Sequence, residues 1–491
     1  MNKKAGFFIM KARLVAAKNI ISYLVVLLCG IFFLGGCQQG GAVSGDSLSR
    51  AAFQESSGDA KLSVFLRLKE PEGPNLWIKI SNLELGSYNT WFPLRTAREE
   101  ILCQDMRSNG QILAGRGGVP AGRYQSVRFT VEKAALEREG EKVLLSVDNP
   151  VIEINFPVEL SLTKGDSTSL FVTWDVAGSM QGTAMLSPKM TINLQRIPLV
   201  TDLAYVSCPE LDTIYIVRTD VNMVCGSIGI SGKPTTIIAN LDKNRLFVLA
   251  PKDSAVKIFE LTSNRLIDQI RIPLSVKSTY MAVSSDGKWA YLLDEMGNNL
   301  VRLNLQTGTV DGQIRVGSRP KYMLYLEEQN LLAISCAYAQ KVYFLDATSL
   351  TIVNTVDTGG TPDGLLARDN YLFVAESSSN SVSVFELPGG RNKARFNVGV
   401  KPRRLVFGNS HIYISNYGAG NVSLLRPGQL NVSRSIQVGG MPCAMDVSLS
   451  RQWLYVGDEN KGGVCVVDLS SNKVAGWIEL GAPPDTVVVV N

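Results

Sequence analysis

The sequence predicts an all-β protein with two parts, a β-sandwich followed by a seven-bladed β-propeller that the C-terminal strand closes. Two observations carry this prediction. Short segments between residues 60 and 196 alternate apolar and polar residues with period two. From about residue 200 onwards, a pattern of about 40 residues recurs to the end of the chain. A third observation, an apolar N-terminal segment that ends at a cysteine, predicts where the protein resides.

The N-terminal 36 residues have the features of a secretory signal. They hold five basic residues and no acidic one, and an apolar run extends from about Ile20 to Leu34. Without these five, basic and acidic side chains are equal in number, so the net charge of +5 belongs to this segment. A chain that is otherwise neutral gives no electrostatic case for binding nucleic acid, and we expect none as a partner.

The segment Leu34-Gly35-Gly36-Cys37 resembles the lipobox of bacterial lipoproteins. The resemblance implies cleavage before Cys37 and acylation of its thiol and new amino group, for example with palmitate. Several acyl chains hold a protein firmly to a membrane. We therefore expect a signal peptide at 1–36, a lipidated tether at 37–59, and a membrane-anchored protein of the cell envelope. Gln38 in place of aspartate favours the outer membrane, on its periplasmic or surface face.

Residues 60–196 are expected to form the sandwich. Four alternating runs, 61–68, 76–85, 124–132 and 169–176, are separated by turn-forming residues. Such strands suit antiparallel sheets with one buried face. A short helix is expected at 95–102. The pieces "KLSVFLRL", "VPAGRYQSVRF", "LSLTKGDSTSLFVTWDVAGSM" and "LSPKMTI" resemble domain of unknown function family 4382, which implies an exported β-domain without an established activity.

Residues 197–491 carry the repeats. A turn recurs at Pro234, Ser278, Pro320, Pro362, Pro402, Pro442 and Pro484, spaced 40 to 44 residues apart. Two further apolar series follow each turn, as in "LYVGD" and "VCVVDL". Four short strands per period predict propeller blades. Segments such as "IYISNYGAGNVSLL" resemble the YVTN β-propeller family.

The two ends of the repeat region complement each other. Residues 203–230 match the second to fourth strands of a blade, and "DTVVVVN" at 485–491 matches a missing first strand. We therefore expect the C-terminal strand to complete the first blade and remove open sheet edges.

Candidate binding residues follow from blade geometry. The turn before the first strand and the loop after the second strand open on one face, around the channel mouth. From the first series we select Lys321, Asp363, Arg403 and Asp485, and from the second Asp294, Glu376, Asn416 and Asp458. We do not predict a metal site, because Asp294, Glu376 and Asp458 lie on non-adjacent blades and no EF-hand-like run is present.

The cysteines leave one candidate disulfide. Cys208 and Cys443 fall on the same face where the first and last blades meet, although buried free thiols are the commoner outcome. The single histidine, His411, is expected in a turn away from the mouth, and no haem-attachment, zinc, phosphate-loop or dinucleotide motif is present. We expect no cofactor.

Three functions remain open. The first is a binding or scaffold lipoprotein whose channel mouth recognises an envelope protein, a polysaccharide or another polar ligand. The second is a propeller enzyme, lactonase-like or lyase-like, that works in the channel mouth. The third is a redox protein with a propeller-bound cofactor. The absence of catalytic motifs favours the first, since the fold does not choose among them.

Overall fold

The computed structural model describes residues 58–138, 141–196, 202–273, 276–429 and 431–490. The expected signal peptide and lipobox, Cys37 and nearly all of the expected tether lie outside these ranges. Everything from residue 58 onwards belongs to one compact unit. Within the described ranges, no helix combines the length and the apolar character that crossing a bilayer requires.

Residues 60–194 form two sheets that enclose one core. The first has the order β13-β10-β1-β6-β4, and the second β11-β12-β8-β7-β2-β3, with β5 on β2 and β9 on β7. The elements are β1 (Ala60–Leu68), β2 (Leu76–Ser87), β3 (Thr90–Pro93), β4 (Arg95–Thr96), β5 (Glu100–Leu102), α2 (Cys103–Asn109), β6 (Gln111–Val119), β7 (Gly122–Arg138), β8 (Glu141–Val147), β9 (Val151–Leu162), β10 (Ser167–Asp175), α3 (Val176–Ser179), β11 (Met180–Gln181), β12 (Met185–Leu186) and β13 (Lys189–Leu194).

Two expectations for this part are wrong. The segment 95–102 is not helical: it holds the short strands β4 and β5, and the helix α2 begins at Cys103. Both strands add to sheet edges, so pairing outweighs the helix-forming residues of "RTAREEIL". The sheets are also not purely antiparallel, because β1 pairs with β10 in parallel. The apolar faces do meet, with Ile78, Leu85 and Trp174 fully buried between the sheets.

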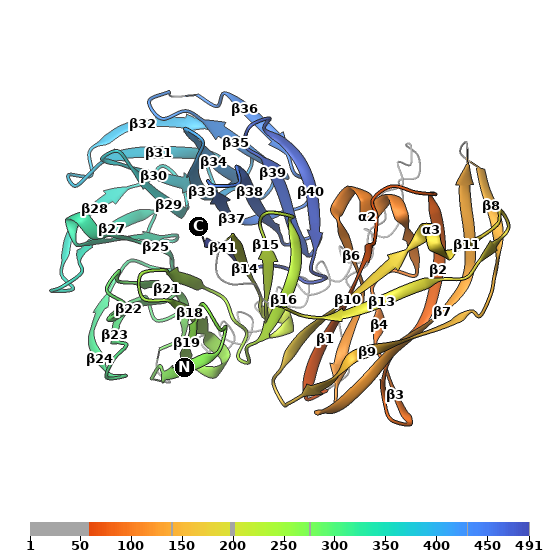
Figure 1. Cartoon of the computed structure of the whole chain (residues 1–491). Helices are drawn as coiled ribbons and strands as arrows, with labels where there is room; N and C mark the ends of the chain where they lie inside the picture. The colour runs from red at the N-terminus through yellow and green to blue at the C-terminus, as the bar shows by residue number, and fades with distance from the viewer. Residues whose placement is uncertain (1–57, 139–140, 197–201, 274–275, 430, 491) are drawn as a thin grey trace, which may run out of the picture. The chain divides into compact units, whose positions relative to one another are not determined.

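The described part of residues 203–490 forms seven four-stranded antiparallel sheets (Figure 1). Their strands are β14 (Leu203–Cys208), β15 (Thr213–Arg218), β16 (Met223–Gly229); β17 (Ile237–Asn240), β18 (Arg245–Ala250), β19 (Ala255–Glu260), β20 (Leu266–Arg271); β21 (Ser278–Val283), β22 (Trp289–Asp294), β23 (Asn299–Asn304), β24 (Val310–Arg315); β25 (Pro320–Leu326), β26 (Leu331–Cys336), β27 (Lys341–Asp346), β28 (Ile352–Asp357); β29 (Pro362–Arg368), β30 (Tyr371–Glu376), β31 (Ser381–Glu386), β32 (Asn392–Asn397); β33 (Pro402–Gly408), β34 (His411–Asn416), β35 (Asn421–Leu425), β36 (Arg434–Gln437); β37 (Pro442–Ser448), β38 (Trp453–Asp458), β39 (Gly463–Asp468), β40 (Lys473–Glu479) and β41 (Thr486–Val490). Three 3₁₀ turns occupy Pro209–Leu211, Pro251–Asp253 and Glu327–Gln329.

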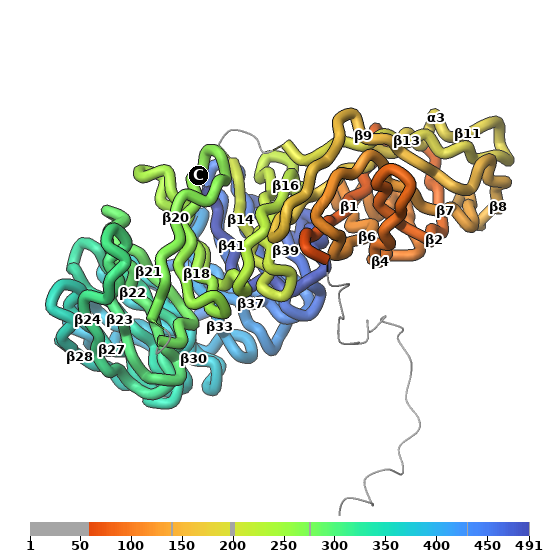
Figure 2. Tube along the Cα trace, turned by 90° about the horizontal axis from the view of Figure 1, so that it is seen from below, coloured from red at the N-terminus to blue at the C-terminus, as the bar shows by residue number. Residues whose placement is uncertain are grey.

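The last strand joins the first sheet. β41 pairs antiparallel with β14, from Ser207 opposite Thr486 to Leu203 opposite Val490, so this sheet has the order β16-β15-β14-β41. Both ribbon and tube views place these two strands side by side (Figures 1 and 2). The pairing expected from the incomplete repeat is therefore present. It satisfies backbone groups that β14 would otherwise leave open.

The seven sheets contact one another mainly through their first strands. β41 contacts both β37 and β17, and β25 contacts β21 and β29. In Figure 1 the strands β25, β29, β33, β37 and β41 lie nearest the centre of the arrangement. Apolar side chains fill the spaces between neighbouring sheets: Tyr291 and Ile334, for example, belong to one buried cluster. The apolar side chains thus occupy the spaces between the sheets, and the polar residues at the starts of the first strands lie at the centre.

One apolar cluster joins the sandwich to the sheets at both ends of the repeat region. Phe65 stacks on Phe171 with ring centroids 5.7 Å apart and meets the edge of Tyr215 at 6.2 Å. The Ser63 hydroxyl lies 2.9 Å from the Tyr215 hydroxyl. The Glu479 carboxylate accepts a hydrogen bond from the Leu113 amide at 3.3 Å. Because these groups are buried or half-buried, the two parts share core surface as well as a linker.

Candidate functional site

A repeated irregularity at the start of the first strands positions the central side chains. In β21, β25, β29, β33 and β37 the pairing register shifts immediately after the turn residue, for example between Pro320 and Tyr322 and between Pro402 and Leu405. A bulge leaves a residue outside the ladder and redirects its side chain. In β33 the shift leaves two consecutive residues, Arg403 and Arg404, outside the ladder, and both line the centre.

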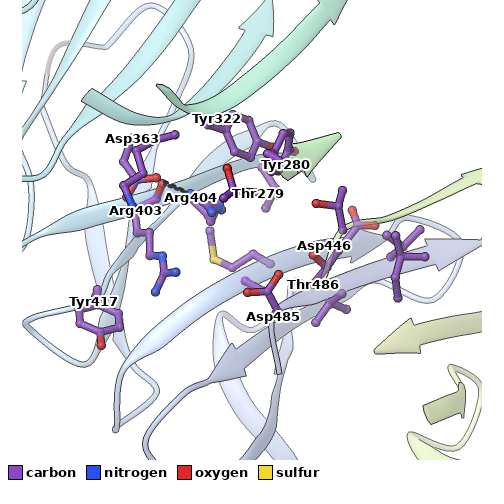
Figure 3. A pocket seen from close by; sticks show the side chains of 18 of the residues that line it. Thr279, Tyr280, Tyr322, Asp363, Arg403, Arg404, Tyr417, Asp446, Asp485 and Thr486 are labelled. Atoms are coloured by element: carbon purple, nitrogen blue, oxygen red, sulfur yellow. Dashed lines mark hydrogen bonds and ion pairs between the residues drawn. The ribbon is translucent and has the colours of Figure 1, made fainter. Parts of the chain in front are cut away.

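These side chains line a central cavity of about 590 Å³. Four of the residues selected from the sequence are on its wall: Lys321, Asp363, Arg403 and Asp485. Residues that the repeat pattern did not single out share the wall with them, namely Tyr280, Tyr322, Arg404, Tyr417 and Asp446 (Figure 3). The volume is sufficient for a ligand of the size of a sugar or a cofactor fragment.

One part of the wall combines a cation with aromatic rings. The Arg404 guanidinium forms an ion pair with Asp363, Nη1 to Oδ1 2.5 Å, and lies 4.7 Å from the centre of the Tyr322 ring (Figure 3). The Tyr322 and Tyr280 ring centroids are 4.6 Å apart. Burial acts to lower the pKa of Arg404, but the carboxylate of Asp363 outweighs it and raises the pKa above its ordinary value. Arg404 is therefore a fixed, permanent cation.

Two further cations on the wall are held by carboxylates. Arg403 pairs with Glu459, Nη1 to Oε2 3.2 Å, and lies 5.2 Å from the Tyr417 ring centre. Lys321 pairs with Glu295 at 2.9 Å. Burial acts to raise the pKa of Glu295, but Lys321 and a neighbouring arginine lower it overall. Each of these pairs is half-buried, so it fixes side-chain geometry more than it adds stability.

Two carboxylates on the wall have no ion-pair partner in the described structure. Asp446 accepts hydrogen bonds from the backbone amides of Val489 at 2.7 Å and Val447 at 2.8 Å. Burial raises the pKa of Asp446 to about 6, although the hydrogen bonds from these two amides act to lower it. Burial also raises the pKa of Asp485, although Arg404 and Arg403 oppose it. Both side chains border the cavity: Asp485 is exposed to its water, and Asp446 is half-buried.

The other four residues selected from the sequence do not line the cavity. All four end second strands with buried side chains: Asp294, Glu376, Asn416 and Asp458. Asp458 Oδ1 accepts from the backbone amides of Met441, Asn460 and Lys461 at 2.9 to 3.0 Å. Glu376 accepts from the Ser381 and Ser383 hydroxyls and pairs with Arg395 at 2.9 Å. Asp294, Glu376 and Asp458 thereby hold loops at this end of the sheets. Asn416 instead donates to Asn421 and Ser423 of β35.

The candidate disulfide pair is reduced in this structure. Cys208 and Cys443 are buried in the same apolar cluster and are free thiols. Each sulfur points to different carbonyls: Cys208 to Ala482 at 3.9 Å, and Cys443 to Pro484 at 3.2 Å. Burial raises the pKa of Cys443 to about 12, so the thiol is not activated as a nucleophile. His411 lies at the start of β34 and is absent from the cavity wall.

The described ranges contain no group of three or more histidine, cysteine, aspartate or glutamate side chains that could hold a metal ion. Asp294, Glu376 and Asp458 are each engaged with their own loops, as described above.

Comparisons with known proteins place the chain by fold alone. No protein-family model matches the sequence. No curated protein matches it either.

Solved structures are similar at low sequence identity. A functionally unknown protein from Desulfotomaculum acetoxidans is 14% identical, with a TM-score of 0.53 over 59% of this chain and 99% of that chain. A "putative 6-phosphogluconolactonase" from Bacteroides fragilis is 12% identical, with a TM-score of 0.51 over 60% of this chain and all of that chain. The dihydro-haem d1 dehydrogenase NirN is 14% identical, with a TM-score of 0.47 over 58% and 66%. The first two support the β fold, and none of the three carries an activity over to this chain.

Proposed function

We propose that this protein is a lipoprotein of the bacterial cell envelope whose C-terminal part binds a polar ligand in a central cavity. The anchor rests on the basic and apolar N-terminal segment and on the lipobox-like Leu34-Gly35-Gly36-Cys37. Cys37→Ser removes the acylation site. We expect the wild-type chain in the membrane fraction and the variant in the soluble fraction of lysed cells. Equal membrane recovery of both would refute lipid anchoring.

The proposal includes a seven-bladed propeller as the binding part. Its support is the seven four-stranded sheets, the contacts between successive first strands from β21 to β37 and on through β41 to β17, and the pairing of β41 with β14. In this architecture the C-terminal strand β41 completes the first blade by pairing with β14 and also contacts β37 of the last blade. Residues 60–196 would form the sandwich domain next to the anchor, and residues 197–491 the propeller.

The observation that supports binding best is the composition of the cavity wall. It places cations, carboxylates and tyrosines around about 590 Å³ of space, and Asp446 and Asp485 have no ion-pair partner among the described residues. A polar ligand would complete the hydrogen bonding of these groups, which is a common reason for leaving them incomplete. The partner would be a small polar molecule, a polysaccharide or a loop of another envelope protein.

Blocking the cavity tests this proposal. Thr279 is exposed and lines the cavity, so Thr279→Trp would fill the space without disturbing the core. Thr307 is exposed in a turn at the other end of its sheet, and Thr307→Trp is the matched control. Each protein is dialysed against a low-molecular-mass envelope extract, and retained molecules are measured by mass spectrometry. We expect enrichment by the wild type and by the control, but not by Thr279→Trp. Equal enrichment by all three would place binding elsewhere.

Catalysis in the same cavity is the second candidate, because Asp446 has a pKa near 6 and lies on the wall. Such a carboxyl exchanges protons near neutral pH, as general acid–base catalysis requires. A lactonase-like or lyase-like reaction would then depend on Asp446. If Asp446→Asn binds the retained molecule normally but no longer converts it, the protein is an enzyme. If the wild type returns the molecule unchanged after prolonged incubation, it is a binding protein.

A further inference from the structure

Five exposed lysines lie in the loops at one end of the seven sheets and have no carboxylate partner in the described structure. We call them the lysine rim: Lys233, Lys252, Lys277, Lys401 and Lys461. Lys233, Lys277 and Lys401 belong to the turns that precede first strands, while Lys252 and Lys461 belong to the loops that follow second strands.

The two loop series lie together at one end of the sheets. The backbone amide of Lys252 bonds to the carbonyl of Gly232 at 3.0 Å, which joins the loop after β18 to the turn before β17. The amide of Tyr417 bonds in the same way to the carbonyl of Lys401 at 2.9 Å. Because Lys401 also lines the cavity, this end of the sheets contains its entrance.

The carboxylates of the same loops do not neutralise the lysine rim. Most of them already pair with other cations, as Asp212 does with Lys61, Asp253 with Lys257, Glu295 with Lys321, Asp363 with Arg404, and Glu459 with Arg403. Outside the cavity, Glu210 is the exposed carboxylate of these loops that has no cationic partner in the described ranges. Outside the cavity wall, four of these lysines therefore stand against one unpaired carboxylate, which makes this end of the sheets positive in a chain whose charge outside residues 1–36 is balanced.

The interior imposes a second requirement. Asp446 and Asp485 lie on the wall formed by β37 and the start of β41, apart from Arg403 and Arg404 (Figure 3). These carboxylates would repel a bare inorganic anion, but they accept hydrogen bonds from hydroxyl groups. Hydroxyls of Thr279, Tyr280 and Thr486 line the same space and both donate and accept. A matching ligand therefore carries a negative charge at one end and hydroxyl groups at the other.

We propose that the cavity takes a hydroxylated acid of about monosaccharide size, with its acid group towards Arg403 and the lysine rim and its hydroxyl groups towards Asp446 and Asp485. This inference rests on the proposed function, because it specifies the ligand class of the same cavity. The ligand is either a free sugar acid or the terminal unit of an acidic polysaccharide, since both present the same chemistry. The lysine rim acts on the approach of the ligand, and Arg403 acts on the bound acid group.

Clustered charges at an entrance raise association rates by about ten-fold or more at low ionic strength, and salt removes this gain. Salt would weaken the attraction between Arg403 and the acid group less, because Arg403 is half-buried and contacts the ligand directly. The inference thus predicts two separable effects: a salt-dependent contribution from the lysine rim and a specificity for acids from the interior.

Calorimetric titration of the full protein tests both effects. The probes are glucuronate, glucose, glucosamine and a short oligoglucuronate, each at 20 and 200 mM NaCl. The rim variant is Lys233→Glu/Lys252→Glu/Lys277→Glu, which leaves every cavity-lining residue in place. The control is Lys243→Glu/Arg391→Glu/Lys473→Glu, with the same charge change at exposed positions in or next to turns at the opposite end of the sheets.

We expect wild type and control to bind glucuronate at least ten-fold more tightly than glucose or glucosamine, and several-fold more weakly at the higher salt concentration. The rim variant should bind glucuronate more weakly at low salt and lose most of this salt dependence. Tighter binding of the oligomer than of glucuronate would identify a polysaccharide end as the source, and the reverse a free sugar acid.

Equal affinity for glucose, or tighter binding of glucosamine, would overturn the inference but leave a polar-ligand site standing. Equal loss in rim variant and control would remove the role of the lysine rim. Failure of every sugar to bind would overturn the ligand class, whereas the cavity itself is judged by the separate dialysis experiment with Thr279→Trp.

Discussion

The titration of Asp446 gives a stability prediction whose size follows from the structure. Its carboxylate accepts a hydrogen bond from the backbone amide of Val489 and so connects β37 to the C-terminal strand β41. Burial raises its pKa from the ordinary 3.8 to about 6. A pKa shift of one unit corresponds to about 1.4 kcal/mol, so the shift of roughly two units corresponds to about 3 kcal/mol. Because the cavity admits water to this side chain, that figure is an upper value.

The sign follows from which state holds the proton. In the unfolded chain Asp446 loses its proton near pH 4, whereas in the folded protein it keeps the proton up to about pH 6. The folded state therefore binds more protons in this window, and its stability falls as the pH rises from about 4 to about 6. Above pH 6 the full destabilisation by the buried charge is present, and below pH 4 it is absent.

Asp446→Asn removes this cost. The amide oxygen still accepts from Val489, but one of the two backbone hydrogen bonds is lost, at a cost of about 1 kcal/mol. At pH 7.5 the variant should be up to about 2 kcal/mol more stable than the wild type. At pH 4 the difference should disappear or reverse. Urea unfolding of both proteins at pH 4, 5, 6 and 7.5 measures the difference, and other carboxylates cancel because both proteins contain them. A difference that is the same at every pH would refute the reasoning.

Four further predictions concern the elements around the cavity. Truncation after Pro484 removes β41 and exposes the edge of β14, so the melting temperature should fall by more than about 5 °C. An unchanged melting temperature would mean that the pairing of β41 with β14 does not stabilise the fold. Glu376→Ala leaves Ser381, Ser383 and Arg395 without their buried acceptor and should cost about 3 kcal/mol in urea unfolding, whereas a cost below 1 kcal/mol would contradict that role. Gly440 has a φ of 57°, and the methyl group of Gly440→Ala would clash with Asp458 Oδ2. The variant should therefore unfold at lower urea concentration than the control Gly428→Ala, whose added methyl group meets no atom. Alkylation of the denatured, unreduced protein should label both Cys208 and Cys443; protection of both would reveal a disulfide.

The repeat pattern predicted the sheets well because each period repeats the same local interactions. Short continuous apolar runs specify strands that are buried on both faces, and a fixed turn every 40 to 44 residues specifies their grouping. The incomplete first repeat and the surplus final strand also indicated the pairing of β41 with β14. The sandwich was predicted less completely. The parallel pairing of β1 with β10 joins residues about 100 positions apart, and no local pattern encodes it.

The cavity wall was predicted in part, for a physical reason. Position in the repeat selected Lys321, Asp363, Arg403 and Asp485, and all four line the cavity. The same reasoning selected Asp294, Glu376, Asn416 and Asp458, because the loop after each second strand was expected to open on the same face. Here those side chains turn back to satisfy the amides and hydroxyls of adjacent loops. Arg404 was missed because the bulge in β33, which periodicity does not reveal, leaves it outside the ladder beside Arg403. Tyr322 was missed because it directly follows the bulged residue Lys321 in β25.

The central claim is that an acylated envelope protein carries a small polar molecule in its propeller cavity. Mass spectrometry of the full chain, extracted from membranes with mild detergent, tests it most directly, with one spectrum under native and one under denaturing conditions. The account predicts an acyl mass on the peptide beginning at Cys37 in both spectra, and an additional small-molecule mass in the native spectrum that denaturation removes. An unmodified Cys37, together with identical native and denatured masses, would contradict it.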